Sequence, residues 1–273
     1  MSQTLPTIFE IKAVIAEAKG IKTFVFHGDL EFQPGQFVMA WLPRIDEKPL
    51  GIWRMKKGEF RLTVSAVGDF SQKFSEQKVG DQVGIRGPLG HGFSILENKK
   101  IVLVGGGFGV APLLGLAERA TNCEVHFLIG ARSKNLIFGE KYAKKFGKVL
   151  LSTNDGSCGE KCFATDLLEK VLVEQKIDKV FSCGPELMMK RVAEICQEKN
   201  VDCELSLERY MKCGIGICGS CAMDDSGWCA CSDGPVIDGA QALKSGEFGK
   251  YHRDSVGVRE NFGNNLQNKL LLE

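Results

Sequence analysis

Five cysteines between residues 213 and 231 constrain this sequence more than any other feature. Four residues separate Cys213 from Cys218, two separate Cys218 from Cys221, and Cys229 and Cys231 follow. This C-x4-C-x2-C…C spacing is typical of the four thiolate ligands of a plant-type [2Fe–2S] cluster. Glycines alternate with the cysteines, which lets backbone N–H groups turn toward the sulfurs. The sequence therefore predicts an iron–sulfur site built on Cys213, Cys218 and Cys221.

The spacing alone leaves the fourth ligand open, because both Cys229 and Cys231 follow at a suitable distance. A structural zinc site also takes four cysteines, but usually as two close pairs rather than three cysteines in one loop. Structural disulfides require an oxidising compartment. An odd total of eleven cysteines with a metal-type cluster suits a reducing cytoplasm better. We therefore expect a cytoplasmic iron–sulfur protein.

Charge and hydropathy exclude several kinds of partner. The chain has 35 Lys and Arg against 34 Asp and Glu, which gives no electrostatic basis for binding nucleic acid or an anionic membrane. The longest uncharged run, residues 101–117, is interrupted by glycines and is too short to span a bilayer. The first residues lack the basic-then-apolar pattern of a signal peptide. We expect neither a nucleic-acid partner nor a membrane.

The 273 residues suit two domains and a small appendage. The first part, residues 1–97, shows short alternating or apolar runs separated by turn residues, which is typical of a small antiparallel β-barrel. The predicted strands are residues 9–15, 21–26, 36–42, 60–67 and 82–86. The pattern by itself does not say whether such a barrel binds a ligand.

From residue 98 to 203 the pattern changes to alternating strands and helices, which predicts a parallel sheet in an α/β domain. The predicted strands are residues 101–104, 124–129, 149–152, 179–183 and 201–207. The predicted helices are residues 113–120, 139–146, 165–175 and 186–199. Thr165 or Asp166 is the expected cap of one helix, and Pro185 is expected to open the next. Residues 204–273 form the remaining arm and a polar tail.

The first strand of this domain runs into a glycine-rich turn that contains Gly105, Gly107 and Gly109 and ends at Pro112. We expect Pro112 at the first helical position, where its missing N–H costs nothing. Glycines between a strand and a helix let a diphosphate approach the backbone N–H groups. The turn departs from the G-x-G-x-x-G dinucleotide motif. A tight packing turn without a ligand is therefore the alternative interpretation.

Another candidate binding element is the sequence Cys183, Gly184 and Pro185. Cys183 ends a predicted strand at the carboxyl edge of the sheet, where open α/β folds bind ligands. Buried free cysteines are common in protein cores, so a purely structural role is equally compatible with the pattern.

The three parts in this order resemble the ferredoxin–NADP reductase superfamily, which has a flavin barrel and a nicotinamide domain. Within it, the chain is similar to the electron-transfer subunits of type B, NAD-dependent dihydroorotate dehydrogenase. Residues 208–221 and the Cys-Ser-Asp-Gly-Pro-Val segment that begins at Cys231 carry this resemblance. The family's fourth ligand directly precedes such an acidic-Gly-Pro segment, which favours Cys231 over Cys229. The superfamily's nicotinamide motifs match the Gly105 turn and the Cys183 segment, so the resemblance implies that both line an NAD site.

The resemblance also implies FAD in the barrel. The family's Arg-Pro-x-Ser motif is replaced here by Lys48, Pro49, Leu50 and Gly51, and its Gly-Thr pair at the pyrophosphate by a Phe-Ser pair that ends at Ser71. A lysine keeps the positive charge but loses the bidentate fork of arginine. We expect these residues, together with Gly68, to contact FAD.

The family's activity implies an electron conduit in pyrimidine biosynthesis, in which electrons pass between NAD, FAD, the [2Fe–2S] cluster and an FMN-containing catalytic subunit that oxidises dihydroorotate. The resemblance implies a heterotetramer of two subunits of each kind, and no catalytic acid, base or nucleophile in this chain. The aromatic residues Phe248, Tyr251 and Phe262 of the tail are the expected docking surface.

Two alternatives stay open at this point. One is an electron-transfer subunit of a related complex, such as a bifurcating ferredoxin–NADP oxidoreductase or a hydrogenase, although the bifurcating relatives tend to have Asp where this chain has Cys213. The other is a non-enzymatic iron–sulfur or zinc sensor with a nucleotide input. The sequence does not decide between NAD and NADP, because the segment after residue 129 has no acidic residue for an adenosine ribose and Arg132 suits a phosphate or solvent equally.

Overall fold

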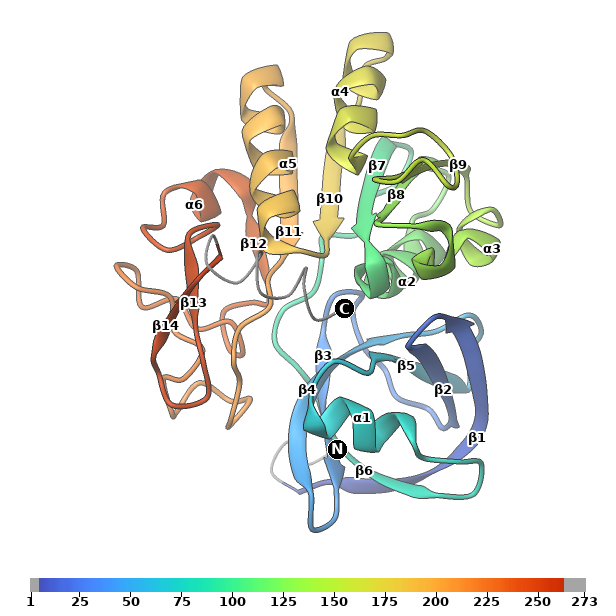
Figure 1. Ribbon diagram of the computed structural model, residues 1–273, viewed down its shortest axis with the longest axis vertical. Helices are drawn as coiled ribbons and strands as arrows, with labels where there is room; N and C mark the ends of the chain where they lie inside the picture. Colours follow the sequence, from blue (N-terminus) through green and yellow to red (C-terminus); the bar gives the residue numbers. More distant parts are fainter. Residues whose placement is uncertain (1–4, 263–273) are drawn as a thin grey trace.

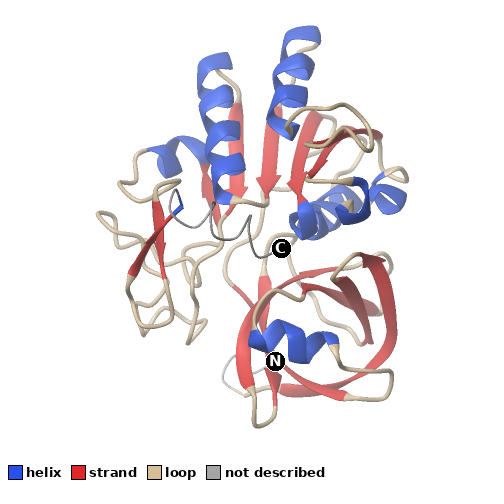
Figure 2. Cartoon of the chain, viewed as in Figure 1, coloured by secondary structure: helices blue, strands red, loops and turns tan. Residues whose placement is uncertain are grey.

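The computed structural model describes residues 5–262 and contains three parts that lie side by side (Figure 1). A β-barrel occupies one end of the molecule and an α/β domain the other. An arm made mainly of loops lies beside both of them (Figure 2). Within the described residues, no helix is both long and apolar enough to cross a membrane.

The barrel is closed by six antiparallel strands in the order β1-β2-β5-β4-β3-β6. Their bounds are β1 Thr7–Ala18, β2 Ile21–His27, β3 Phe37–Leu42, β4 Asp46–Trp53, β5 Glu59–Ser65 and β6 Gln82–Leu89. The predicted antiparallel barrel is confirmed, but β4 was not predicted because its polar residues and Pro49 do not alternate with apolar ones. β4 pairs with β3 from Asp46 to Gly51 and with β5 at Ile52 and Trp53. Pro49 therefore lies where the strand has one partner, which a proline tolerates.

Aromatic side chains fill the barrel. Phe24 packs edge-to-face on Phe74 with ring centroids 4.9 Å apart, and Phe26 stacks on Phe60 at 5.0 Å. Phe74 belongs to a short helix, α1 (Asp69–Ser75), which packs its buried face onto this core. The sequence patterns did not predict α1, because seven residues are too few to show helical periodicity.

The second domain holds a six-stranded sheet in the order β12-β11-β10-β7-β8-β9. Its strands are β7 Lys100–Gly106, β8 Glu124–Ala131, β9 Lys148–Thr153, β10 Lys179–Cys183, β11 Asp202–Ser206 and β12 Val236–Asp238. Its helices are α2 Val110–Arg119, α3 Glu140–Ala143, α4 Ala164–Glu174 and α5 Glu186–Lys199, with 3₁₀ turns η1 Gly107–Gly109 and η2 Lys134–Leu136. Strands β7 to β11 are parallel, as predicted, and β12 returns from the arm to pair antiparallel with β11.

Several predicted helix ends were wrong. α2 begins at Val110, so Pro112 occupies the third helical position, still within the first turn, where no intrahelical donor is needed. α3 is a single turn, shorter than predicted. Phe163 precedes α4 as its N-cap, and Asp166 accepts a hydrogen bond from the Phe163 N–H at 2.8 Å instead of capping the helix itself. Pro185 is the N-cap of α5 rather than its first residue.

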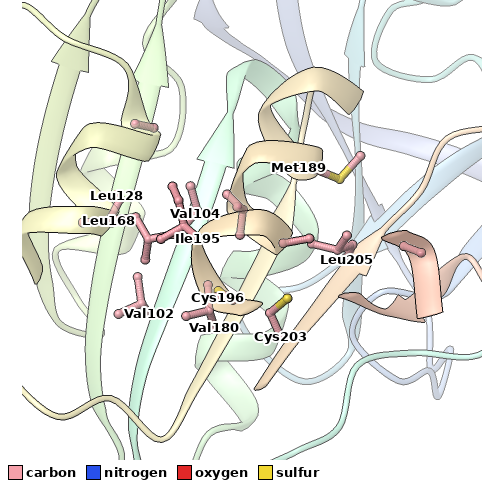
Figure 3. Packing of buried hydrophobic residues seen from close by; sticks show 14 of the residues in the cluster. Val102, Val104, Leu128, Leu168, Val180, Met189, Ile195, Cys196, Cys203 and Leu205 are labelled. Carbon is pink, nitrogen blue, oxygen red and sulfur yellow. The ribbon is translucent and has the colours of Figure 1, made fainter. Parts of the chain in front are cut away.

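Strands β7, β10 and β11 and the helices α4 and α5 enclose the main core of the α/β domain (Figure 3). Val102, Val104 and Val180 from the strands pack against Leu168 of α4 and Ile195 of α5. Because both faces of the sheet are covered, its central strands are mostly apolar, which is why the sequence predicted a parallel sheet.

Trp53 joins the barrel to the α/β domain. Its side chain is fully buried in the second core of the α/β domain, with ring centroids 5.5 Å from Tyr142 and 6.4 Å from Phe138. Its indole N–H donates to Thr63 Oγ1 at 3.0 Å, so the polar end of the ring is also satisfied. Burying an aromatic residue this completely fixes the two domains relative to each other.

The arm leaves the sheet after β11 and comes back to it at β12. It then forms a short helix, α6 (Gly239–Leu243), and a two-stranded hairpin of β13 (Tyr251–Arg253) and β14 (Arg259–Asn261). Asp224 anchors this hairpin, because its carboxylate accepts hydrogen bonds from Tyr251 Oη at 2.6 Å, Arg253 Nη2 at 2.9 Å and Arg259 Nη2 at 2.8 Å. These bonds hold the pKa of Asp224 down at about 2, with Tyr251 and Arg253 as the main causes.

Candidate functional site

The cysteine loop packs directly on the barrel. Phe37 and Met39 of β3 and Leu89 of β6 form one apolar cluster with Cys221 and Cys231. From the same barrel face, Arg86 Nη2 donates to the carbonyl oxygen of Cys213 at 3.0 Å, while Arg86 also pairs with Glu47 at 2.8 Å. An iron–sulfur cluster bound by this loop would therefore lie against the barrel wall.

Backbone N–H groups of the loop point at the sulfurs, as the glycine pattern predicted. Gly216 N–H donates to Cys231 Sγ at 3.1 Å, Ile215 N–H to Cys213 Sγ at 3.5 Å, and Cys231 N–H to Cys221 Sγ at 3.4 Å. Gly216 has a φ of 79°, a backbone conformation that favours glycine. Such donors stabilise thiolates, so the residues present fit an iron–sulfur cluster.

The cysteines differ in their surroundings. The Ser220 hydroxyl hydrogen-bonds the exposed Cys218 sulfur and lowers the pKa of Cys218 to about 6. Burial, and then contact with Cys221, raise the pKa of Cys231 to about 12, so this thiol loses its proton only in exchange for a metal. Within the described residues, no three Cys, His, Asp or Glu side chains surround a single-ion site.

The two predicted nicotinamide elements lie against each other. A Cβ added at Gly109 would come within 2.5 Å of the Cys183 carbonyl oxygen, and one at Gly106 within 2.6 Å of Pro185. The glycines are thus required for backbone contact between the two loops. Gly107 differs, because it has a φ of 55° and a Cβ there would meet nothing within 4 Å. The structure leaves open space at Gly107, where a diphosphate has room to approach the backbone N–H groups of η1.

Cys183 is buried at the carboxyl edge of the sheet, and burial raises its pKa to about 12. The charge of Glu208 contributes to this shift, while a hydrogen bond from Ser206 opposes it. The pKa of Glu208 is itself raised. The main cause is desolvation of its carboxyl group by the surrounding protein, and the second is repulsion from the Glu186 carboxylate. Glu208 and Ser206 were not among the predicted site residues, although Ser206 ends the last parallel strand and Glu208 follows two residues later.

The predicted flavin residues occupy two places on the barrel. Lys48 Nζ pairs with Asp46 at 2.6 Å and donates to Tyr210 Oη at 3.0 Å. Burial opposes charge on Lys48, but these hydrogen bonds outweigh it and raise the Lys48 pKa. Leu50 packs on the barrel core, whereas nothing lies within 4 Å of a Cβ added at Gly51.

The second place is the start of α1. Ser71 Oγ accepts the backbone N–H groups of Val67 at 3.0 Å and Gly68 at 2.9 Å, so it caps its own helix. A Cβ added at Gly68 would meet nothing within 4 Å. This turn is open to a ligand through its backbone rather than through a free serine hydroxyl.

Comparison with known proteins agrees with this geometry. Residues 208–242, which include all five cysteines of the arm, match the iron-sulfur cluster binding domain of dihydroorotate dehydrogenase B. The probable dihydroorotate dehydrogenase B (NAD(+)) electron transfer subunit of Methanocaldococcus jannaschii is 45% identical, over 93% of this chain and 98% of that protein. This chain belongs to that family. The subunit of the same name from Pyrococcus furiosus is 43% identical over 88% of this chain and 93% of its own length.

Solved structures of reductases have the same fold as this chain. A chain of the NADH-dependent reduced ferredoxin-NADP oxidoreductase, described for flavin-based electron bifurcation, superposes with a TM-score of 0.78 at 32% identity, over 86% of this chain and 89% of that one. A ferredoxin reductase of carbazole 1,9a-dioxygenase superposes with a TM-score of 0.62 at 20% identity, over 71% of this chain and 65% of that one, which shows the fold alone. The predicted resemblance and fold class are confirmed, and the chain is an oxidoreductase subunit of the electron-transfer kind.

In this electron transfer subunit a buried ionic network lies between the loop of Cys183, Gly184 and Pro185 and the cysteine loop. Arg209 donates through Nη1 to Glu186 Oε2 at 2.5 Å and through Nε to Glu247 Oε1 at 2.8 Å. Glu186 is the first residue of α5, directly after Pro185, and Glu247 Oε2 accepts the backbone N–H of Asp224 at 2.8 Å. No local sequence pattern indicates this network, because the three charged residues are far apart in the chain.

The expected aromatic docking surface on the tail was wrong in part. Phe248 is buried in the core of the α/β domain, and Tyr251 bonds to Asp224. Phe262 packs on the ring of His252 at 5.1 Å. The exposed apolar residues of the arm include Ile217, which is 78% exposed, between two of the cluster cysteines.

Proposed function

We propose that this chain carries electrons between NAD and an FMN-containing catalytic subunit that oxidises dihydroorotate, through bound FAD and a [2Fe–2S] cluster. One segment, residues 206–213, carries this proposal because it passes all three cofactor sites in turn. Ser206 and Glu208 lie at Cys183, Tyr210 bonds to Lys48, and the Cys213 carbonyl is held by Arg86. The order of sites along the segment is nicotinamide, flavin and cluster, which is the order that electron transfer requires.

The ligands proposed for the cluster are Cys213, Cys218, Cys221 and Cys231. The choice of Cys231 is supported by its burial and by the N–H that it accepts from Gly216. When bound, FAD converts the two-electron chemistry of NAD into single electrons, which the cluster carries onward. The residues of this chain position the cofactors and tune their redox potentials, and they supply no acid, base or nucleophile.

The barrel up to about residue 97 is the proposed FAD domain and the α/β unit the proposed NAD domain. A boundary at residue 203 would cut β11, so we place the start of the cluster arm after Ser206. Lys48, Pro49, Gly51, Gly68 and Ser71 remain the proposed FAD contacts, and Leu50 is proposed to contribute through its backbone. The proposed NAD contacts are Gly105, Gly107, Gly109, Pro112, Cys183, Gly184 and Pro185.

The NAD proposal predicts a large effect at Gly107. Gly107→Val would put a branched side chain into the open space beside η1, where it would block a diphosphate. We expect NADH-dependent reduction of bound flavin to fall on the order of 100-fold, by loss of binding worth about 3 kcal/mol, while flavin content stays unchanged. Stopped-flow absorbance of the flavin measures both.

Gly58→Val is the matched control, because Gly58 also has a positive φ of 81° and no atom within 4 Å of an added Cβ, but it lies on the turn between β4 and β5. Gly58→Val introduces the same backbone strain, but NADH should reduce the bound flavin as fast as in the wild type. Unchanged reduction kinetics in Gly107→Val would remove this turn from the NAD site.

The partner proposal predicts that the isolated chain forms no NADH from dihydroorotate and NAD. Within residues 5–262, the three parts leave no segment for a substrate barrel of roughly 250 residues. Adding the FMN-containing subunit of the same organism should start NADH formation, followed at the nicotinamide absorbance. NADH formation by the isolated chain would contradict the conduit function. No gain with the catalytic subunit would favour a related electron-transfer complex such as the bifurcating oxidoreductase.

We further propose a cytoplasmic heterotetramer of two chains of each kind. The unpaired thiols throughout the described chain fit a reducing compartment. The exposed Ile217 and the half-exposed Ile215 beside the cluster, rather than the tail aromatics, are the proposed contact with the catalytic subunit. Mass measurement of the purified complex tests its stoichiometry.

A further inference from the structure

The fifth cysteine of the arm, Cys229, packs in the same apolar cluster as Cys221 and Cys231. Residues 229–233 form a turn, in which the N–H groups of Ser232 and Asp233 both donate to the Cys229 carbonyl, at 3.1 and 2.8 Å. The turn places Cys229 and Cys231, which are two residues apart, in the same apolar cluster as Cys221.

Backbone contacts tie the Cys229–Cys231 segment to Cys221 and to the residue after it. Cys231 N–H donates to Cys221 Sγ at 3.4 Å, and Ala230 N–H donates to the Cys221 carbonyl at 3.2 Å. Cys229 forms an antiparallel bridge with Ala222, the residue after Cys221. Cys229 and Cys231 therefore approach one cluster ligand from the same turn.

The two thiols have different hydrogen-bond partners. Cys231 Sγ accepts the Gly216 N–H at 3.1 Å, a contact that suits a thiolate. Cys229 Sγ instead donates to the Gly227 carbonyl at 3.5 Å, and its backbone N–H donates to the Asp233 carboxylate at 2.8 Å. The surroundings of Cys229 suit a protonated thiol that stands next to the ligand set.

We propose that Cys229 is a reserve ligand, which binds iron in place of Cys231 when the Cys231 sulfur is absent. The inference rests on the proposed cluster function. In the exchange, the Cys229 S–H releases its proton to solvent as the iron–sulfur bond forms, which the partial exposure of Cys229 allows. One thiolate takes the place of another, so the charge of the ligand set and the oxidation state of the iron do not change.

The test compares iron and acid-labile sulfide content, visible absorbance and electron paramagnetic resonance of purified variants. Cys231→Ala should keep most of the wild-type iron with shifted resonance positions, because the new ligand has different hydrogen bonds. Cys229→Ala should keep both the iron and the wild-type spectrum. The double variant Cys229→Ala/Cys231→Ala should lose the cluster.

The matched control is Cys158→Ala/Cys231→Ala, because Cys158 is also a partly exposed cysteine but lies in the loop after β9. It should behave like Cys231→Ala, and flavin content reports that each variant is folded. If Cys231→Ala loses its iron while the wild type keeps it, the reserve role is overturned, but the proposed cluster function is not. Iron loss in Cys229→Ala would make Cys229 the native ligand and overturn it as well. A wild-type chain without iron would instead overturn the proposed cluster function.

Discussion

Replacing Cys218 with alanine should remove the cluster and lower NADH formation in the presence of the catalytic subunit by on the order of 100-fold or more. This exceeds the 10–100-fold losses typical of residues that only support a metal ligand. Cys218 is the exposed cysteine of the loop, and its hydrogen bond with Ser220 lowers its pKa to about 6, which favours the thiolate form that binds iron. Cys229 packs against Cys221 and Cys231, so we expect no rescue at this position.

The measurement separates the two halves of the electron path. NADH reduction of bound flavin should continue in Cys218→Ala, because the nicotinamide and flavin sites do not include this residue. Cys158→Ala is the control for loss of a surface thiol and should behave as the wild type. A Cys218→Ala protein that keeps both its iron and its rate with the catalytic subunit would exclude Cys218 as a ligand.

Replacing Arg209 with methionine should lower the free energy of unfolding by about 3–5 kcal/mol, the usual cost of removing one partner from a buried ion pair. The Arg209, Glu186 and Glu247 side chains are 3%, 7% and 2% exposed, so the change would leave two carboxylates in the interior without their cation. For a chain of this size the loss corresponds to a fall of roughly 6–20 °C in the unfolding midpoint. Thermal scans with and without NAD would measure it.

Arg191→Met is the matched control. Arg191 lies on α5, the helix that carries Glu186, and pairs with Glu169 at 2.5 Å, but both side chains are more than two-fifths exposed. Surface pairs contribute about 0–1 kcal/mol, so its midpoint should barely move. Equal unfolding midpoints for Arg209→Met and Arg191→Met would show that the buried network does not hold the start of α5 and the arm together.

Local patterns in the sequence determined a large part of this protein. The cysteine spacing predicted the iron–sulfur loop because three of the four ligands of such a cluster come from one tight loop with this spacing. The apolar strands predicted the parallel sheet because burial on both faces leaves few polar positions, and β7, β8 and β10 were found where expected. Strand β4 and helix α1 were missed, because β4 is held by its pairing with β3 and α1 by burial of Phe70 and Phe74.

Only the tertiary structure decided how the three sites meet. Arg86 reaches Cys213 across 127 positions of sequence, and Lys48 reaches Tyr210 across 162, and neither pair has a local signature. The buried position of Arg209 is likewise fixed by packing of the arm on α5, since its sequence neighbours would suit an exposed arginine equally well. Local patterns report what a short segment needs, namely a turn, a buried face or a ligand spacing. Contacts between distant segments depend on how the whole chain packs, and they set the order of the proposed nicotinamide, flavin and cluster sites.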